Sequence, residues 1–389
     1  MPQKIVAEPN YEDRLKKLIS KLVHVTTNID RNKVKKEIAD IFPKMDPDMI
    51  AKEISAFSRN NQDIADIFTL MIINGNLSSA VFLATKAIQT SLNRTYTPIF
   101  EQLAEIPPQE LEILLNEMDS SLGAILMSNC SMDRKKAANV STIMIRQKHA
   151  KKVAEILSAV FKSDESSTLA ILRQMLPYNV MRLLLEFKKS LAAKVISSLD
   201  AIGYIDLVGF RVYSTLIRNN KVNEAAAIAN IAIAKYPQPS ISQLRKIKTA
   251  LLRVLLLSLT IENAGMVMVN LLPVVGGRLY KEFLDQDNTD MVGKIATEAM
   301  KAGKDITIIH LKGLEQEKLF LLLFHMDDNE AATLLLSLEH SSSIYSAMLG
   351  RKEYNKKALS ILLAVERDQP ALATLLKLKG RIKFSRVDE

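Results

Sequence analysis

Three helix starts follow one another closely between residues 105 and 144, and this rhythm constrains the fold more than any other feature. The first start is Pro107-Pro108, and the second and third are the dipeptides Met118-Asp119 and Met132-Asp133. An Asp before a helix can accept the unpaired N–H groups of the first turn, and the preceding Met can pack back onto that turn. Apolar residues then recur at the spacing of one helix face. The sequence therefore predicts short helices joined by short turns.

The same dipeptide occurs twice more, near each end of the chain. Met45-Asp46 is followed by Pro47, which suits the first position of a helix. Met326-Asp327 is followed by Glu330, which is placed to complete a capping box. No segment alternates polar and apolar residues at a period of two, so we expect essentially no sheet. Helical spacing predicts further helices over residues 11–25, 33–42, 46–57, 64–73, 78–88, 152–161, 167–175, 178–187, 192–199, 242–259, 265–272, 277–284, 291–302, 314–325, 330–338, 344–349, 356–365 and 371–378.

Two distant segments repeat one pattern. NGNLSSAVFLATKAI at residues 74–88 aligns without gaps on NNKVNEAAAIANIAI at residues 219–233. Small residues at helical spacing let the two helices of a hairpin approach closely, as in tetratricopeptide-type hairpins. The sequence therefore predicts an all-α fold of the helical-repeat type, an armadillo-, HEAT- or tetratricopeptide-like superhelix. The aligned alanine pairs are Ala80 with Ala225, Ala84 with Ala229 and Ala87 with Ala232.

The strongest break in the helical pattern is Pro237-Gln238-Pro239, because proline disfavours a helical conformation at the residue before it. We place the one domain boundary of the chain there. It separates an N-terminal helical-repeat region, residues 11–236, from a C-terminal one, residues 240–378. Residues 1–10 are expected to be a disordered tail and residues 379–389 a basic tail.

Composition narrows the class of protein. Hydrophobic residues make up 48% of the chain and aromatic residues 5%, and the 12 Gly and 12 Pro are too few for a strand-rich fold with many turns. The single cysteine, Cys130, excludes an internal disulfide framework and favours a reducing compartment. The N-terminus lacks the apolar core of a secretory signal, and the most apolar runs, residues 254–261 and 319–324, are too short for a membrane span. We therefore expect a cytoplasmic protein without a transmembrane segment.

The recurring unit, a hydrophobic residue followed by Asp or Pro, a few polar residues and paired aliphatic residues, resembles two known helical arrays. One is the α-helical superhelix at the N-terminus of MgtE-type magnesium transporters. The other is the armadillo-like repeats of the bacterial flagellar motor switch protein. The chain departs from both, since it has no transmembrane domain and no Glu-His-Pro-Gln-type motif. The resemblance implies a fold class and a place in a bacterial machine, and it is carried by residues 42–54, 106–126, 132–140, 175–184 and 326–335.

No residue pattern predicts a metal site. The histidines never lie three or four positions apart, the spacing of two ligands on one helix face. His325 with Asp327 and Asp328 is better explained as the end of one helix followed by the cap of the next. DQDNTD at residues 285–290 begins like a calcium loop, but its sixth position is Asp290 where such a loop needs Gly. The histidines are His24, His149, His310, His325 and His340.

Catalytic and cofactor sites are not predicted either. Gly276-Gly277 lacks the spaced third glycine and the Gly-Lys-Ser/Thr ending of a phosphate loop, so we interpret it as a turn between helices. Cys130 has no histidine beside it in sequence and is interpreted as a small buried hydrophobic residue. Because no acid–base or nucleophile constellation is present, we predict a protein that is not an enzyme and uses no cofactor or metal.

Basic residues carry most of the functional information. The net charge is +9 with an isoelectric point near 9.3, and residues 134–152 and 211–261 are almost free of acidic residues. We predict two sets of contacts to an anionic partner there, called the first and the second basic group. Either they share one face of a superhelix as a positive strip, or they are a solvated surface that keeps a leucine-rich protein soluble. The first basic group is Arg134, Lys135, Lys136, Arg146, Lys148, Lys151 and Lys152, and the second is Arg245, Lys246, Lys248 and Arg253.

The leading functional hypothesis is a non-enzymatic helical-repeat scaffold. It would hold protein partners, acidic ones among them, in a cytoplasmic bacterial assembly such as flagellar or membrane-associated machinery. The alternative is a helical-repeat protein that grips the phosphate backbone of a nucleic acid through a basic concave strip, without reading the bases. Added salt separates the two, because phosphate binding weakens steeply as the salt concentration rises.

Overall fold

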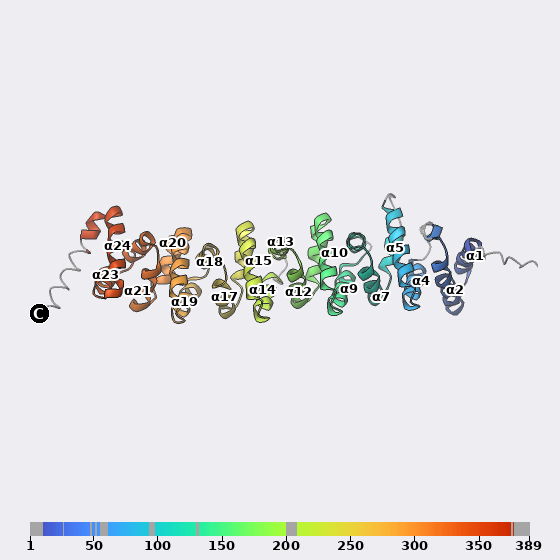
Figure 1. Ribbon diagram of the computed structural model, residues 1–389, viewed down its shortest axis with the longest axis horizontal. Helices are drawn as coiled ribbons and strands as arrows, with labels where there is room; N and C mark the ends of the chain where they lie inside the picture. The colour runs from blue at the N-terminus through green and yellow to red at the C-terminus, as the bar shows by residue number, and fades with distance from the viewer. Residues whose placement is uncertain are drawn as a thin grey trace, which may run out of the picture. The chain divides into compact units, whose positions relative to one another are not determined.

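The computed structural model describes residues 11–25, 27–46, 49–50, 53–54, 61–92, 98–129, 132–199, 208–374 and 376. Every regular element among these residues is a helix, and they contain no strand (Figure 1). The predicted all-α class is therefore confirmed. The chain divides into two compact units, Met1–Lys188 and Lys189–Glu389, called the N-terminal and the C-terminal unit.

The N-terminal unit consists of short helices that pack mainly on helices close to them in the chain. These are α1 (Tyr11–His24), α2 (Asn28–Ile41), the 3₁₀ helix η1 (Phe42–Lys44), α4 (Asn61–Ile73), α5 (Leu77–Ser91), α6 (Ile99–Ala104), α7 (Pro108–Glu117), α8 (Ser120–Ser128), α9 (Arg134–Arg146), α10 (Ala150–Ser163), α11 (Glu165–Arg173) and α12 (Pro177–Glu186). α2 packs on α1 and α4, α7 on α9, and α8 on α10, which also contacts α11 and α12.

The C-terminal unit follows the same scheme. Its helices are α13 (Lys189–Ser198), α14 (Val208–Arg218), α15 (Val222–Lys235), α16 (Pro237–Leu244), α17 (Thr249–Leu256), α18 (Ile261–Val269), α19 (Pro273–Leu284), α20 (Thr289–Leu311), α21 (Gln316–His325), α22 (Asp328–Leu336), α23 (Ser341–Leu349) and α24 (Lys352–Asp368). α13 packs on α15, α18 and α19 pack on α20, and α22 packs on α24. The described helices are all too short or too polar to reach across a bilayer.

Aspartate caps begin helices where the sequence predicts them. Asp119 accepts a hydrogen bond from the backbone N–H two residues further on (2.8 Å), and Asp133 does the same (3.3 Å). Met118 and Met132, which precede these caps, are buried. At each helix start, the aspartate thus accepts a hydrogen bond from a backbone N–H of the first turn, and the methionine is buried. Both are expected from the Met-Asp dipeptide.

Asp327 is an exception to this capping. It stands before α22, but its side chain caps no backbone N–H. Its carboxylate lies instead 3.4 Å from the Lys301 ammonium of α20. The capping box expected with Glu330 is therefore not formed, and the Asp327 backbone N–H donates to the Thr297 hydroxyl instead (3.0 Å).

One hairpin turn occurs four times among the described residues. Two or three residues after the end of its first helix lies a residue with left-handed backbone, namely Gly75, Lys148, Asn220 or Asp287, at φ values of 81°, 74°, 57° and 60°. The N–H of the next residue donates to the carbonyl five residues before it, over 2.9 to 3.3 Å, which is a Schellman arrangement. These turns join α4 to α5, α9 to α10, α14 to α15 and α19 to α20, and they lie roughly 70 residues apart.

The helix after each turn buries the same five positions. The alignment of residues 74–88 with 219–233 identifies the first and third copies through their alanines. The second copy carries larger aliphatic side chains at these positions, so sequence comparison misses it. The buried sets are Ala80, Leu83, Ala84, Ala87 and Ile88; Val153, Ile156, Leu157, Val160 and Phe161; Ala225, Ile228, Ala229, Ala232 and Ile233; and Val292, Ile295, Ala296, Ala299 and Met300.

The domain boundary expected at Pro237-Gln238-Pro239 does not coincide with the division into units. Pro237 is the first residue of α16, where its fixed φ and missing N–H suit the first helical turn. α16 packs on both α14 and α15, so helix packing continues through the prolines. The tails expected at residues 1–10 and 379–389 lie outside the described residues, as does part of the helix expected over 46–57.

A buried ion cluster joins α2 to α4 in the N-terminal unit. The Asp63 carboxylate is 2.5 Å from the Arg31 guanidinium and 2.9 Å from the Lys35 ammonium, which also lies 2.5 Å from Asp66. Asp63 and Lys35 are both buried. Burial alone would raise the pKa of Asp63, but hydrogen bonds from Arg31 and Lys35 outweigh it and hold that pKa below its usual range.

Candidate interaction sites

Three members of the first basic group donate hydrogen bonds to carbonyl groups at the ends of neighbouring helices. Arg134 donates to two carbonyl oxygens at the end of α8 (3.2 and 3.4 Å), Lys136 to the last carbonyl of α6, and Lys152 to the carbonyl that follows α7. The last carbonyls of a helix have no partner within it, so these cations satisfy them across the packed helices. Burial lowers the pKa of the Lys136 ammonium. These three side chains are therefore part of the framework of the unit.

The same use of a cation occurs outside the predicted group. Arg182 of α12 donates to the Ile145 carbonyl in the last turn of α9 (2.9 Å). Lys357 of α24 donates to the carbonyl that follows α21 and lies 2.6 Å from the Asp328 carboxylate. Sequence spacing gives no sign of these contacts, because each acceptor lies some 30 to 40 residues earlier in the chain.

The other members of the first basic group are exposed, and none of them forms an ion pair with a described residue. Most of them surround the α9–α10 turn. Glu112 of α7 lies against this turn, and burial raises the pKa of its carboxyl while His149 opposes the rise. The sequence gives no signal for Glu112, since a carboxylate beside the leucines of α7 is expected to face solvent. The exposed members are Lys135, Arg146, Lys148 and Lys151.

The second basic group is organised differently. Arg245, Lys246 and Lys248 follow the end of α16, are exposed, and form no ion pair with any residue that the structure describes. Arg253 on α17 is half-buried and lies 3.5 Å from the Glu282 carboxylate of α19. Because the two basic groups belong to different units, the single positive strip that joins them stays a prediction.

A groove lies beside the second basic group, between the end of α16 and the start of α19. Its volume is about 370 Å³. Leu272 and Val274, on either side of Pro273 at the start of α19, are 62% and 82% exposed. We call this feature the α16–α19 groove. It is lined by Ser242, Arg245, Lys246, Leu271, Leu272 and Val275.

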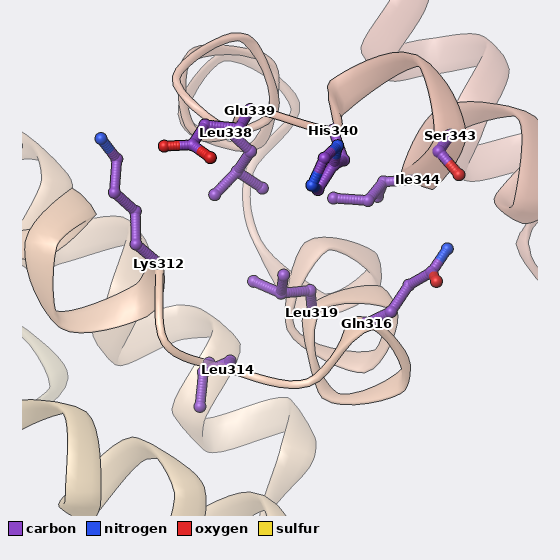
Figure 2. Close-up of a pocket in the computed structure, with 9 residues that line it drawn as sticks. All are labelled: Lys312, Leu314, Gln316, Leu319, Leu338, Glu339, His340, Ser343 and Ile344. Carbon is purple, nitrogen blue, oxygen red and sulfur yellow. The ribbon is translucent and has the colours of Figure 1, made fainter.

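A second hollow, of about 340 Å³, lies between the end of α20, the start of α21 and the connection from α22 to α23 (Figure 2). Lys312 and Glu339 lie on one side of it, and Gln316 and Ser343 on the other (Figure 2). Its rim therefore carries one positive and one negative side chain, and it favours neither an anionic nor a cationic ligand. His340, which no sequence pattern singles out, also lines it, over a base of Leu314, Leu319, Leu338 and Ile344.

No group of three or more histidine, cysteine, aspartate or glutamate side chains among the described residues is placed to hold a metal ion. Two carboxylates of the DQDNTD segment are paired with separate lysines. Asp285 lies 2.5 Å from Lys318, and Asp290 lies 2.7 Å from Lys294. His325 is the last residue of α21, as expected from its sequence context. Cys130 lies outside the described residues.

Gly276 and its neighbour Gly277 lie in the first turns of α19 rather than in a turn between helices. The expected interhelical turn is therefore wrong, and packing explains the glycine. A Cβ on Gly276 would come within 2.6 Å of the His310 ring, which is buried against it. Burial lowers the pKa of His310. The Tyr280 ring lies 6.4 Å away, so the contact is a packed interior with a neutral imidazole.

Comparison with known proteins adds little to this description. No protein-family model matches the chain, and no curated protein matches it. A crystal structure of an engineered protein aligns over 90% of this chain and 98% of its own, with 14% sequence identity and a TM-score of 0.24. A TM-score this low carries no argument about fold or function.

Proposed function

We propose that this chain is a helical-repeat scaffold that holds protein partners. The observation that carries the proposal is the hairpin turn that recurs at Gly75, Lys148, Asn220 and Asp287 with the same buried positions after it. A unit that recurs in this way cannot bury its apolar face alone and is stable only when stacked on its neighbours. The packing of each helix on helices close in the chain supports such a stack.

A stacked array of this kind is a superhelix with an extended concave surface, which suits the binding of other proteins. Two exposed apolar tips support a role in protein contacts. Leu176 and Tyr178 flank Pro177 in the N-terminal unit, and Leu272 and Val274 flank Pro273 in the C-terminal unit. From the resemblance to the transporter and motor switch arrays, we propose that the scaffold works in a cytoplasmic, bacterial-type assembly and has no reaction of its own.

The alternative, a nucleic-acid-binding array, is less well supported. Arg134, Lys136 and Lys152 donate to carbonyl oxygens of the protein, so part of the first basic group is already engaged. A phosphate-binding strip would then rest on the exposed members of both groups. Nucleic-acid binding is therefore the competing outcome of affinity capture from the native cell.

Affinity capture from the native cell tests the proposal. The full chain is immobilised, the extract is treated with nuclease, and bound material is eluted by a series of salt steps. We expect defined protein partners that survive nuclease treatment and remain bound at high salt, because apolar contacts are insensitive to salt. Retention of nucleic acid alone, lost steeply as salt is added, would contradict the scaffold and support phosphate binding.

A further inference from the structure

We infer that the α16–α19 groove binds an acidic, amphipathic segment of a protein partner. This inference rests on the proposed scaffold function and names the chemistry of one partner. The groove combines three features. These are an apolar lining, an apolar tip held in place by a proline, and neighbouring cations without a carboxylate partner.

The apolar part of the groove is held rigidly. Leu271 is buried and anchors the end of α18, while Leu272 is exposed and has an extended backbone at φ −63° and ψ 144°. Pro273 is the first residue of α19, and its ring fixes the direction in which the chain enters that helix. Little conformational entropy is therefore lost when a partner covers Leu272 and Val275, which favours binding.

The charged part of the groove has one sign. Arg245 and Lys246 line it, and Lys248 is exposed next to them in the chain. Neither Arg245 nor Lys246 forms an ion pair with a described residue, and Glu282 of α19 is shared by Arg253 (3.5 Å) and Arg278 (3.8 Å). A partner segment that brings its own carboxylates to Arg245 and Lys246 would therefore complete the pairing across the interface.

The chemistry of the lining favours a peptide helix over other anionic partners. Single-stranded nucleic acid is held by stacking of bases on aromatic rings, and none of the lining residues is aromatic. A membrane surface needs a broad apolar face, whereas here, among the described residues, the exposed apolar side chains are only Leu272 and Val274 at the edge of a hollow. An amphipathic helix that lays its apolar face into a groove, with acidic residues along its edge, fits both parts.

The N-terminal unit offers an informative contrast. Leu176 and Tyr178 flank Pro177 and are 66% and 51% exposed, so the apolar tip is similar. However, Arg182 on the same helix already donates to the Ile145 carbonyl (2.9 Å), so its guanidinium is partly engaged, unlike Arg245 and Lys246. We therefore assign the acidic partner segment to the C-terminal unit alone.

The test uses the full chain and a synthetic helical peptide in which leucines occupy one face and glutamates the other. Binding is measured by fluorescence anisotropy. Leu272→Asp and the double variant Arg245→Glu/Lys246→Glu should each weaken the dissociation constant by about tenfold or more, as expected for central interface contacts. The same peptide with lysine in place of glutamate should not bind.

Matched controls come from the same unit. Leu363, which is 65% exposed on α24, is changed to Asp, and Lys304 and Lys312, both exposed, are changed to Glu together. These variants should bind the acidic peptide as the natural chain does, and thermal melting should show all variants folded. Equal binding by the groove variants and the controls would overturn the inference, as would binding to anionic phosphatidylglycerol vesicles but not to the peptide.

The outcome can be separated from that of the scaffold proposal. If the groove variants still capture the same cellular proteins and the peptide does not bind, the scaffold stands and this site is wrong. If the peptide binds at the groove while capture yields nucleic acid alone, the site stands and the scaffold function is wrong.

Discussion

The two basic groups look alike in sequence and differ in structure. In the first, Arg134, Lys136 and Lys152 donate to helix-end carbonyls within the N-terminal unit. In the second, Arg245 and Lys246 line an apolar groove and have no partner carboxylate among the described residues. Some cations of a basic cluster thus pair with carbonyl groups at the ends of helices. Only the remaining cations indicate an interaction site.

The interiors of the two units differ in a related way. The N-terminal unit buries charges and pairs them, with Asp63 between Arg31 and Lys35. The C-terminal unit buries His310 as a neutral ring, packed on Gly276. A paired charge therefore fills the interior at Asp63, whereas an uncharged ring fills it at His310.

The largest effect is expected when the buried ion cluster is broken. Asp63→Ala leaves Arg31 without its carboxylate partner and Lys35 with Asp66 alone, and we expect a loss of about 3–5 kcal/mol in the free energy of unfolding of the N-terminal unit. Urea denaturation followed by circular dichroism measures it. Asp66→Ala is the matched control, because Asp66 is half-exposed, and it should cost clearly less. Equal losses would show that burial of the pair is irrelevant.

A smaller effect distinguishes the engaged from the free cations. Lys152→Met leaves the carbonyl after α7 without its donor and should lower stability by about 1 kcal/mol. Lys246→Met and Lys135→Met remove exposed cations and should change stability by less than about 0.5 kcal/mol. The same urea experiment compares them. If Lys246→Met proves as costly as Lys152→Met, the contrast between the two basic groups fails.

The smallest effect is expected from pH. The pKa of His310 in the folded chain lies below its ordinary value of 6.5, so the unfolded chain binds the proton first as pH falls. The contribution of the neutral His310 ring to the stability of the C-terminal unit is therefore fully present above pH 6.5 and declines as pH falls below 6.5. The pKa of Asp63 in the folded chain lies below its ordinary value of 3.8. The contribution of the Asp63 carboxylate to the stability of the N-terminal unit is therefore fully present above pH 3.8 and is lost only as pH falls below it.

The C-terminal unit should therefore lose stability at higher pH than the N-terminal unit. The chain has no tryptophan, so single reporters can be placed in each unit. Phe82→Trp and Phe324→Trp suit this purpose, since these side chains are 47% and 37% exposed. Urea midpoints of each reporter are compared between neutral and mildly acidic pH. His340→Gln, at an exposed histidine, should leave the difference unchanged.

Much of the fold follows from local sequence. Met118-Asp119 and Met132-Asp133 predict both the helix start and the buried methionine, because cap and staple involve residues within one turn. The prolines at 107–108 and 177 likewise mark helix starts. The left-handed residues Lys148 and Asp287 could not be predicted, since neither is glycine and the buried positions on both sides of the turn impose the conformation.

The candidate sites could be predicted only in part. The basic groups are visible as runs of Lys and Arg, but the partner of each cation depends on which helix ends lie beside it. Lys136 reaches the carbonyl of Ala104, a contact that arises from packing across the intervening helices. The groove combines Arg245 with Leu272, and neither residue is unusual by itself. Proximity of this kind comes from tertiary structure and leaves no local pattern.

The packing of each helix on helices close in the chain also has a consequence for how the protein forms. Helices with extensive contacts lie at most three elements apart in the chain, so the loops that must close during folding stay short and little entropy is lost in closing them. Topologies of this type fold rapidly. Early helices can pair with one another while the ribosome is still adding later ones, and the growing chain exposes only the apolar face of its newest hairpin.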